Sequence, residues 1–257
     1  MKTKLSALIL GLGMLATSAA AAPAPGAPPE VLVSPEVVEI GAFFQGKEIA
    51  VKAEIPRGAQ AVLEVVGPKA EEHLMRKGRR GGLWMNVGEV TVTGAPSLYL
   101  AMGTDPKLLQ MGTGGGASWG YAALREKIRF SGRVEPGERD LFLDQFFKLK
   151  ESDEIYAVSP IAAKAAAGPG EQQTVTGRFR LPTRVKPGEY QVCLTVVQDG
   201  QTRASNCAPL RVKMVGFPAL LASLAYGHGA TYGILAVVIA IVTGFAMGYL
   251  FKGGGGH

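Results

Sequence analysis

The sequence predicts a mainly β protein: an immunoglobulin-like β-sandwich with a helical insertion, followed by a single C-terminal transmembrane helix. Three observations lead to this prediction. Short segments that alternate apolar and polar residues, separated by glycine and proline, recur over residues 31–213. Two stretches with helical spacing interrupt them within residues 105–152. An uncharged run of twenty residues, Tyr232–Phe251, is long enough for a helix to cross a bilayer.

The composition argues against several classes of protein. The 257 residues are 47% hydrophobic, which is too apolar for a disordered chain. Two cysteines and three histidines, none of them clustered, leave few ligands for zinc, haem or iron–sulfur sites, so we expect no metal and no cofactor. The net charge of +6 falls to about +3 without the lysines of the terminal segments, which is too little to predict nucleic-acid binding.

Residues 1–21 have the features of a secretory signal peptide. Two lysines precede an uncharged stretch, Leu5–Ala16, and small residues lead to a cleavage site after Ala20 or Ala21. An uncleaved membrane anchor is the alternative, for which the apolar run is short. Residues 22–30 then alternate proline with small residues, which predicts an extended spacer without a core of its own.

Residues 31–213 are expected to form one periplasmic β-sandwich domain, and its first part consists of strand patterns. Turns rich in glycine and proline separate apolar segments at the spacing that is typical of a β-sandwich. The predicted strands of this part are Val31–Ile40, Glu48–Ile55, Ala61–Val66, Leu83–Val92 and Ser97–Met102.

A helical insertion is predicted at residues 105–152. Its first helix, Ser118–Phe130, has Ser118 as an N-cap, and its second is Glu138–Lys150. The stripe of Phe142, Phe146 and Leu149 is expected in the core, and a docking surface is the alternative. The second helix repeats the spacing with Leu143, Phe146, Phe147 and Lys150.

A final β unit follows a loose stretch at residues 161–170. A Pro-Gly-x-Tyr turn precedes its central strand, as in many immunoglobulin-like sandwiches, and the Tyr190 hydroxyl is expected to cap a loop. Asp199 and Gly200 predict a hairpin turn. The predicted strands on either side of these features are Glu154–Val158, Thr174–Leu181, Tyr190–Val196 and Gln201–Val212.

Cys193 and Cys207 lie on the two arms of that hairpin. A two-residue turn leaves them one position out of register, and a three-residue loop or one bulge would bring them opposite each other. In an oxidising periplasm they are expected to form a structural disulfide, which closes a loop of about fifteen residues and contributes ~3 kcal/mol.

The C-terminal part is expected to hold the protein in the bacterial inner membrane. Residues 214–231 form a juxtamembrane segment, and residues 232–251 span the bilayer once. A translocated N-terminus followed by one span leaves residues 252–257 as a cytoplasmic tail. Gly244 and Gly248 form a G-x-x-x-G pattern, which favours close pairing with another helix.

Two further clusters are candidate sites. Arg76, Lys77, Arg79 and Arg80 crowd a predicted short loop, which is a solvated turn or a site for an anion, an acidic partner or lipid head groups. Residues 116–120 match the G-x-S-x-G pattern of hydrolases, but no strand pattern precedes Ser118 and no suitable histidine follows it. A catalytic set is therefore not expected.

Several short motifs occur along the mature chain: Leu83–Val87, Gly94–Tyr99, Leu181–Pro182, Pro187–Tyr190, Tyr232–Ala236, Thr243–Phe245 and Phe251–Lys252. In this combination the sequence resembles the putative transmembrane protein family of alphaproteobacteria and related bacteria. The resemblance carries over no established activity, and because the family's genes often lie near sulfite-exporter-like permeases, it implies an accessory role. Residues 112–116 depart from the family's pattern.

Together these features predict a membrane-anchored periplasmic accessory or scaffold protein, not an enzyme. Its expected partners are the lipid bilayer and an integral membrane protein such as an anion permease of the sulfite type, or a second copy that pairs through the transmembrane helix. A periplasmic anion-binding or sensing domain that uses the basic cluster is the alternative, and a hydrolase is the third hypothesis.

Overall fold

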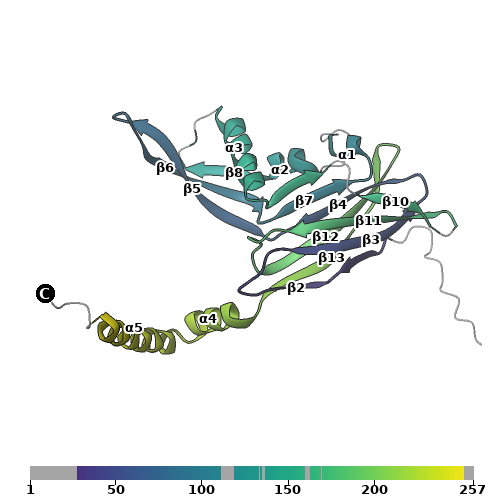
Figure 1. Cartoon of the computed structure of the whole chain (residues 1–257). Helices are drawn as coiled ribbons and strands as arrows, with labels where there is room; N and C mark the ends of the chain where they lie inside the picture. Colours follow the sequence, from purple (N-terminus) through teal and green to yellow (C-terminus); the bar gives the residue numbers. More distant parts are fainter. Residues whose placement is uncertain are drawn as a thin grey trace, which may run out of the picture.

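The computed structural model describes residues 28–110, 119–132, 134, 137–159, 163–168 and 170–251. In this part the protein is mainly β, and a C-terminal apolar helix follows the sheets (Figure 1). The predicted signal peptide, most of the predicted spacer, the residues 112–116 and the predicted tail at 252–257 lie outside the described residues.

Two sheets form the body of the protein. Their inner faces share one core, which makes a β-sandwich, as predicted. The first sheet has the order β1 (Val31–Ser34), β3 (Lys47–Pro56), β11 (Gln172–Leu181), β10 (Lys164–Ala167). The second has the order β2 (Val37–Ile40), β13 (Gln201–Met214), β12 (Gly188–Gln198), β4 (Gln60–Val66), β7 (Tyr99–Gly103), β9 (Tyr156–Ser159).

The core forms because alternate residues of each strand are apolar. In β3 alternate side chains, those of Ile49, Val51, Ala53 and Ile55, point inward and are buried, while the residues that alternate with them are exposed. The Tyr190 hydroxyl donates a hydrogen bond to the Lys186 carbonyl at 2.7 Å, so the predicted loop cap is present. This contact and the strand orders agree with an immunoglobulin-like arrangement.

The first predicted strand is in fact two strands. Pro35 lies between β1 and β2 and has no N–H to donate, so it interrupts the ladder. After this break the chain crosses to the other sheet, where β2 pairs in parallel with β13. The prediction of one continuous strand over Val31–Ile40 was therefore wrong at its centre.

A long hairpin, here called the arm, replaces the loop predicted around the basic cluster. It consists of β5 (Lys69–Arg80) and β6 (Leu83–Pro96), and Figure 1 shows it extending beyond the sandwich. The short strand β8 (Arg129–Gly132) completes a third sheet beside β6. The strand β5 escaped prediction because it carries charged residues on both faces, which leaves no clear apolar alternation.

The described part of the predicted insertion contains three helices as well as β8. They are α1 (Pro106–Gln110), α2 (Gly120–Lys127) and α3 (Arg139–Ser152). The helix predicted over Ser118–Phe130 ends earlier, because the chain becomes extended at Ile128 and then joins the third sheet. Part of the stretch interpreted as loose, residues 161–170, forms β10 instead.

A second core lies between α2, α3, the arm and the sandwich. The residues that α3 buries are Leu143, Phe146, Phe147 and Lys150, the set that shares the helical spacing in the sequence. The stripe of Phe142, Phe146 and Leu149 does not all enter the core: Phe142 is half-buried and Leu149 is exposed. The rest of this core comes from Val92, Ala95, Tyr99, Ala101, Leu124, Ile128 and Tyr156.

Two apolar helices follow β13. They are α4 (Gly216–Gly227) and α5 (Gly229–Phe251), and neither has a buried residue. Among the described residues, α5 is the one helix long and apolar enough to cross a membrane, with a mean hydropathy of 2.4. It begins three residues before the predicted span.

Candidate functional site: the arm and its groove

The basic cluster lies on the arm, and its residues differ in their surroundings. A bulge falls between Arg76 and Lys77, so that Arg76 pairs with Gly88 and Lys77 with Asn86. The hairpin turns at Gly81 and Gly82, whose φ angles of +57° and +83° favour glycine.

Arg76 fastens the arm to the start of α3. Its guanidinium donates two hydrogen bonds to the Glu138 carboxylate, at 2.9 and 3.1 Å, and lies 5.5 Å from the centre of the Phe142 ring. Its charge is therefore balanced locally. Lys77, Arg79 and Arg80 are exposed and form no ion pair within the described part of the chain.

A buried ion pair holds the other end of α3 to the arm. Lys150 is only 5% exposed, and its ammonium lies 2.5 Å from both carboxylate oxygens of Glu72 and 5.0 Å from the centre of the Phe146 ring. Separating the two partners would leave a buried, unpaired charge, which is costly. The pair therefore favours one position of α3 against the arm. The sequence places Lys150 at helical spacing but predicts neither its burial nor its partner, which is 78 residues away.

Between these two anchors lies a groove of about 600 Å³, lined mostly by apolar side chains, with Glu138 and Gln145 among its polar ones. Its floor contains half-buried Phe130 and Phe142, and its rim carries exposed Leu141 and Leu149 of α3. Side chains of this kind can receive apolar groups from another molecule. The arm contributes Leu74, Met75, Arg76, Lys77, Trp84 and Val90 to the lining.

A buried polar contact joins α2 to the second sheet. The Tyr99 hydroxyl donates to the Glu64 carboxylate and accepts a hydrogen bond from the Gly120 N–H at 2.6 Å. Burial raises the pKa of Glu64, although the hydrogen bond from Tyr99 opposes the shift. Burial also raises the pKa of Tyr99, and the neighbouring Glu64 carboxylate adds to it.

The two cysteines lie opposite each other on β12 and β13. Their sulfurs are 2.07 Å apart, at disulfide-bond distance, and a register shift between Val196 and Val197 supplies the bulge that this pairing requires. The bond joins neighbouring strands of one sheet instead of the two sheets of the sandwich. It lies apart from the arm and its groove.

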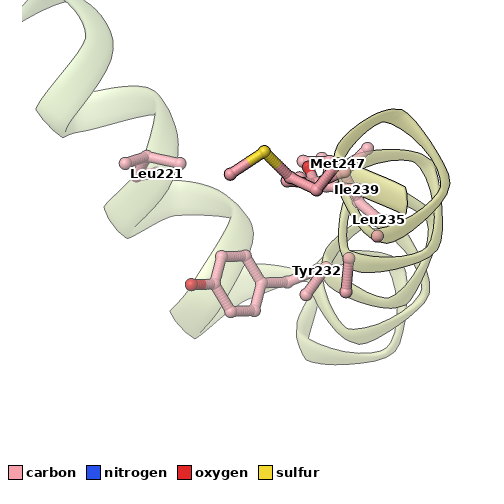
Figure 2. Close-up of a pocket in the computed structure, with 9 residues that line it drawn as sticks. Leu221, Tyr232, Leu235, Ile239 and Met247 are labelled. Atoms are coloured by element: carbon pink, nitrogen blue, oxygen red, sulfur yellow. The ribbon is translucent and has the colours of Figure 1, made fainter. Parts of the chain in front are cut away.

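The predicted helix-packing glycines lie on α5. Apart from the nearby backbone of α5 itself, no atom of the described residues lies within 4 Å of the position that a Cβ would take at Gly244 or Gly248, so the helix surface is open there. Gly244 also lines a shallow apolar groove between α4 and α5, toward which Met247 and Tyr232 extend from α5, facing Leu221 of α4 (Figure 2).

The hydrolase pattern acquires no partner in the described residues. Ser118 lies outside them, and Trp119 and Gly120 are buried at the start of α2. His73 lies on the arm, where its Nδ1 is 2.8 Å from a Glu89 carboxylate oxygen. Over the described ranges, no group of three or more metal-ligating side chains gathers in one place.

One comparison with known proteins identifies a relationship. A family described as "putative transmembrane protein" matches residues 30–253, which include the sandwich, the arm and both C-terminal helices. Comparisons with curated proteins and with solved structures give no significant match. Since the matched region covers most of the chain and ends with the one candidate span in the described part, the protein belongs to the putative transmembrane protein family.

Proposed function

We propose that the protein is a single-pass accessory protein of the bacterial inner membrane, whose β domain faces the periplasm and docks an integral membrane partner without catalysing a reaction. The apolar segment within residues 1–21 supports export of the domain, and the cysteine pair at bond distance supports an oxidising compartment. The helix α5 supplies the anchor.

The groove on the arm is the observation that carries this proposal. It is fixed at one end by Arg76 and Glu138 and at the other by Lys150 and Glu72, so its shape is set before a partner arrives. Preformed grooves bind with less loss of conformational entropy than flexible surfaces. Its exposed leucines would become buried beneath an apolar segment of the partner.

The partner that the family resemblance favours is an anion permease of the sulfite-exporter kind. The bilayer brings such a partner and this protein to a high local concentration, so a modest groove can support binding. The open face of α5 around Gly244 and Gly248 offers a second contact within the membrane, either with that partner or with another copy.

Leu141→Asp tests the groove, because it places a charge on an apolar rim while changing no buried residue. We expect co-purification of the membrane partner from detergent-solubilised membranes to fall at least tenfold, since burying an unpaired carboxylate costs more than ~1.4 kcal/mol. The matched control is Leu32→Asp on β1, because Leu32 is 53% exposed and Leu141 is 56% exposed. Equal recovery of the partner with both variants would contradict the proposal.

An anion-binding or sensing domain is the second candidate function. It is favoured by the exposed cations Lys77, Arg79 and Arg80, which form no ion pair in the described residues. The pairing of Arg76 with Glu138 weakens it, because that arginine already has an anion. A rise in the melting temperature of the isolated protein with sulfite, lost in Arg79→Gln, would favour this candidate over the first.

A further inference from the structure

We propose that the tip of the arm enters the anionic lipid interface of the same bilayer that α5 spans. The tip is defined as residues 77–87. It contains three cations, Lys77, Arg79 and Arg80, and no acidic residue, whereas the acidic residues of the arm lie nearer the sandwich. Cations concentrated at one end of a hairpin complement a surface of anionic head groups.

The pairing of strands in the tip favours lipid over a folded partner as the occupant. Arg80 pairs with Leu83, and the next pair, on the opposite face, is Arg79 with Trp84. Both faces of the ribbon therefore carry a cation beside an exposed apolar side chain. A protein surface covers one face of a ribbon, but a lipid interface surrounds a ribbon that enters end-on.

The residue types match those found at the boundary between water and lipid. Tryptophan prefers this boundary because its ring is apolar and its N–H is polar, while arginine and lysine keep their charges among the head groups. Trp84 is 73% exposed in the structure, so most of its side chain is open to contact from outside the domain.

The fold also holds the tip near a membrane. Figure 1 shows the arm and the helices α4 and α5 extending from the same side of the sandwich. The anchor keeps the tip at a high effective concentration beside the lipid, which lets a small contact area be occupied. Tip insertion would orient the sandwich, because two separate points would then fix it to the bilayer.

The two tryptophans of the chain make a direct test. Trp119 is 4% exposed, whereas Trp84 is open. The full-length protein is reconstituted into vesicles with roughly 30% brominated phosphatidylglycerol, because bromine quenches only tryptophans that reach the lipid and anionic lipids attract the cations. We expect the brominated lipid to quench tryptophan fluorescence in the wild type and not in Trp84→Phe. We also expect the same vesicles to protect the fluorescence of Trp84 from quenching by acrylamide in the aqueous phase.

Charge variants test whether the cations of the tip draw it to the lipid. Each cation near an anionic surface contributes about fivefold to binding, so Lys77→Gln, Arg79→Gln and Arg80→Gln together should weaken tip insertion about a hundredfold at low salt. The control is Lys52→Gln with Lys164→Gln, two exposed lysines on strands β3 and β10. The proposal is overturned if brominated lipid leaves Trp84 unquenched, or if quenching appears only when a partner protein is added.

Discussion

The side chains that tie the insertion to the sandwich and to the arm include polar groups that lie among the apolar residues of the second core. Tyr99 links Glu64 to the backbone of Gly120, and Lys150 links α3 to Glu72. Each of these contacts joins elements that are distant along the chain, so spacing within one element cannot reveal it. The sequence pattern placed Lys150 at the helical spacing of Leu143 and Phe147, because helical periodicity is a local property, but it did not predict that Lys150 is buried.

Glu64 gives a prediction about pH at this scale. Burial raises its folded-state pKa above the ordinary value of 4.5, so the folded protein binds more protons and loses stability as the pH rises through that raised pKa. Glu64→Gln keeps an acceptor for the Tyr99 hydroxyl without a charge. We expect its urea midpoint to exceed that of the wild type at about pH 8 and to approach it near about pH 4.

Circular dichroism of the full chain in detergent micelles measures both midpoints across the pH range. Glu54→Gln serves as the control, because Glu54 is an exposed glutamate on β3 and its replacement should leave the pH dependence unchanged. A difference between Glu64→Gln and wild type that stays constant with pH would contradict the role assigned to burial.

The strands of this fold were predictable from the sequence where one face is buried and the other is exposed to solvent. The strands β3, β11 and β12 meet that condition, and their alternating patterns located them. The strand β5 does not meet it, because the arm is partly solvated on both faces. The groove also escaped prediction, because it forms only when the arm lies beside α3, and these two elements are distant along the chain.

The helix α5 gives a prediction about association. Replacing Gly244 and Gly248 by leucine should preserve insertion and abundance, because leucine is more apolar and equally helical, but should abolish self-association or recovery of the partner. Ala246→Leu is the matched control, since it enlarges a small residue about 200° around the same helix. Crosslinking in native membranes measures the association.

Association that survives in the double leucine variant would leave α5 as an anchor only. In that event the recognition surface would lie in the domain, where the groove on the arm is the candidate. The two tests are independent, because Leu141 and Gly244 lie on separate elements.

For the whole molecule, the proposed export of the sandwich and the candidate span α5 together predict a single orientation. Cysteines introduced at Arg57 and Lys164, both exposed, should react with an impermeant maleimide in intact spheroplasts, and one introduced at Gly255 should not. The two native cysteines give no background, because their sulfurs are at disulfide-bond distance. Labelling at Gly255 alone would reverse the orientation.

The junction between the sandwich and its anchor has a mechanical consequence. The strand β13 continues through Val215 into α4, so tension on the membrane helix enters the fold at the end of a central strand instead of a loop. That strand pairs with both β12 and β2, and the bond between Cys193 and Cys207 stops its peeling at Cys207. Peeling that starts at Met214 is thus confined to the part of β13 that follows Cys207, and the rest of the sandwich is protected from a load on the tether.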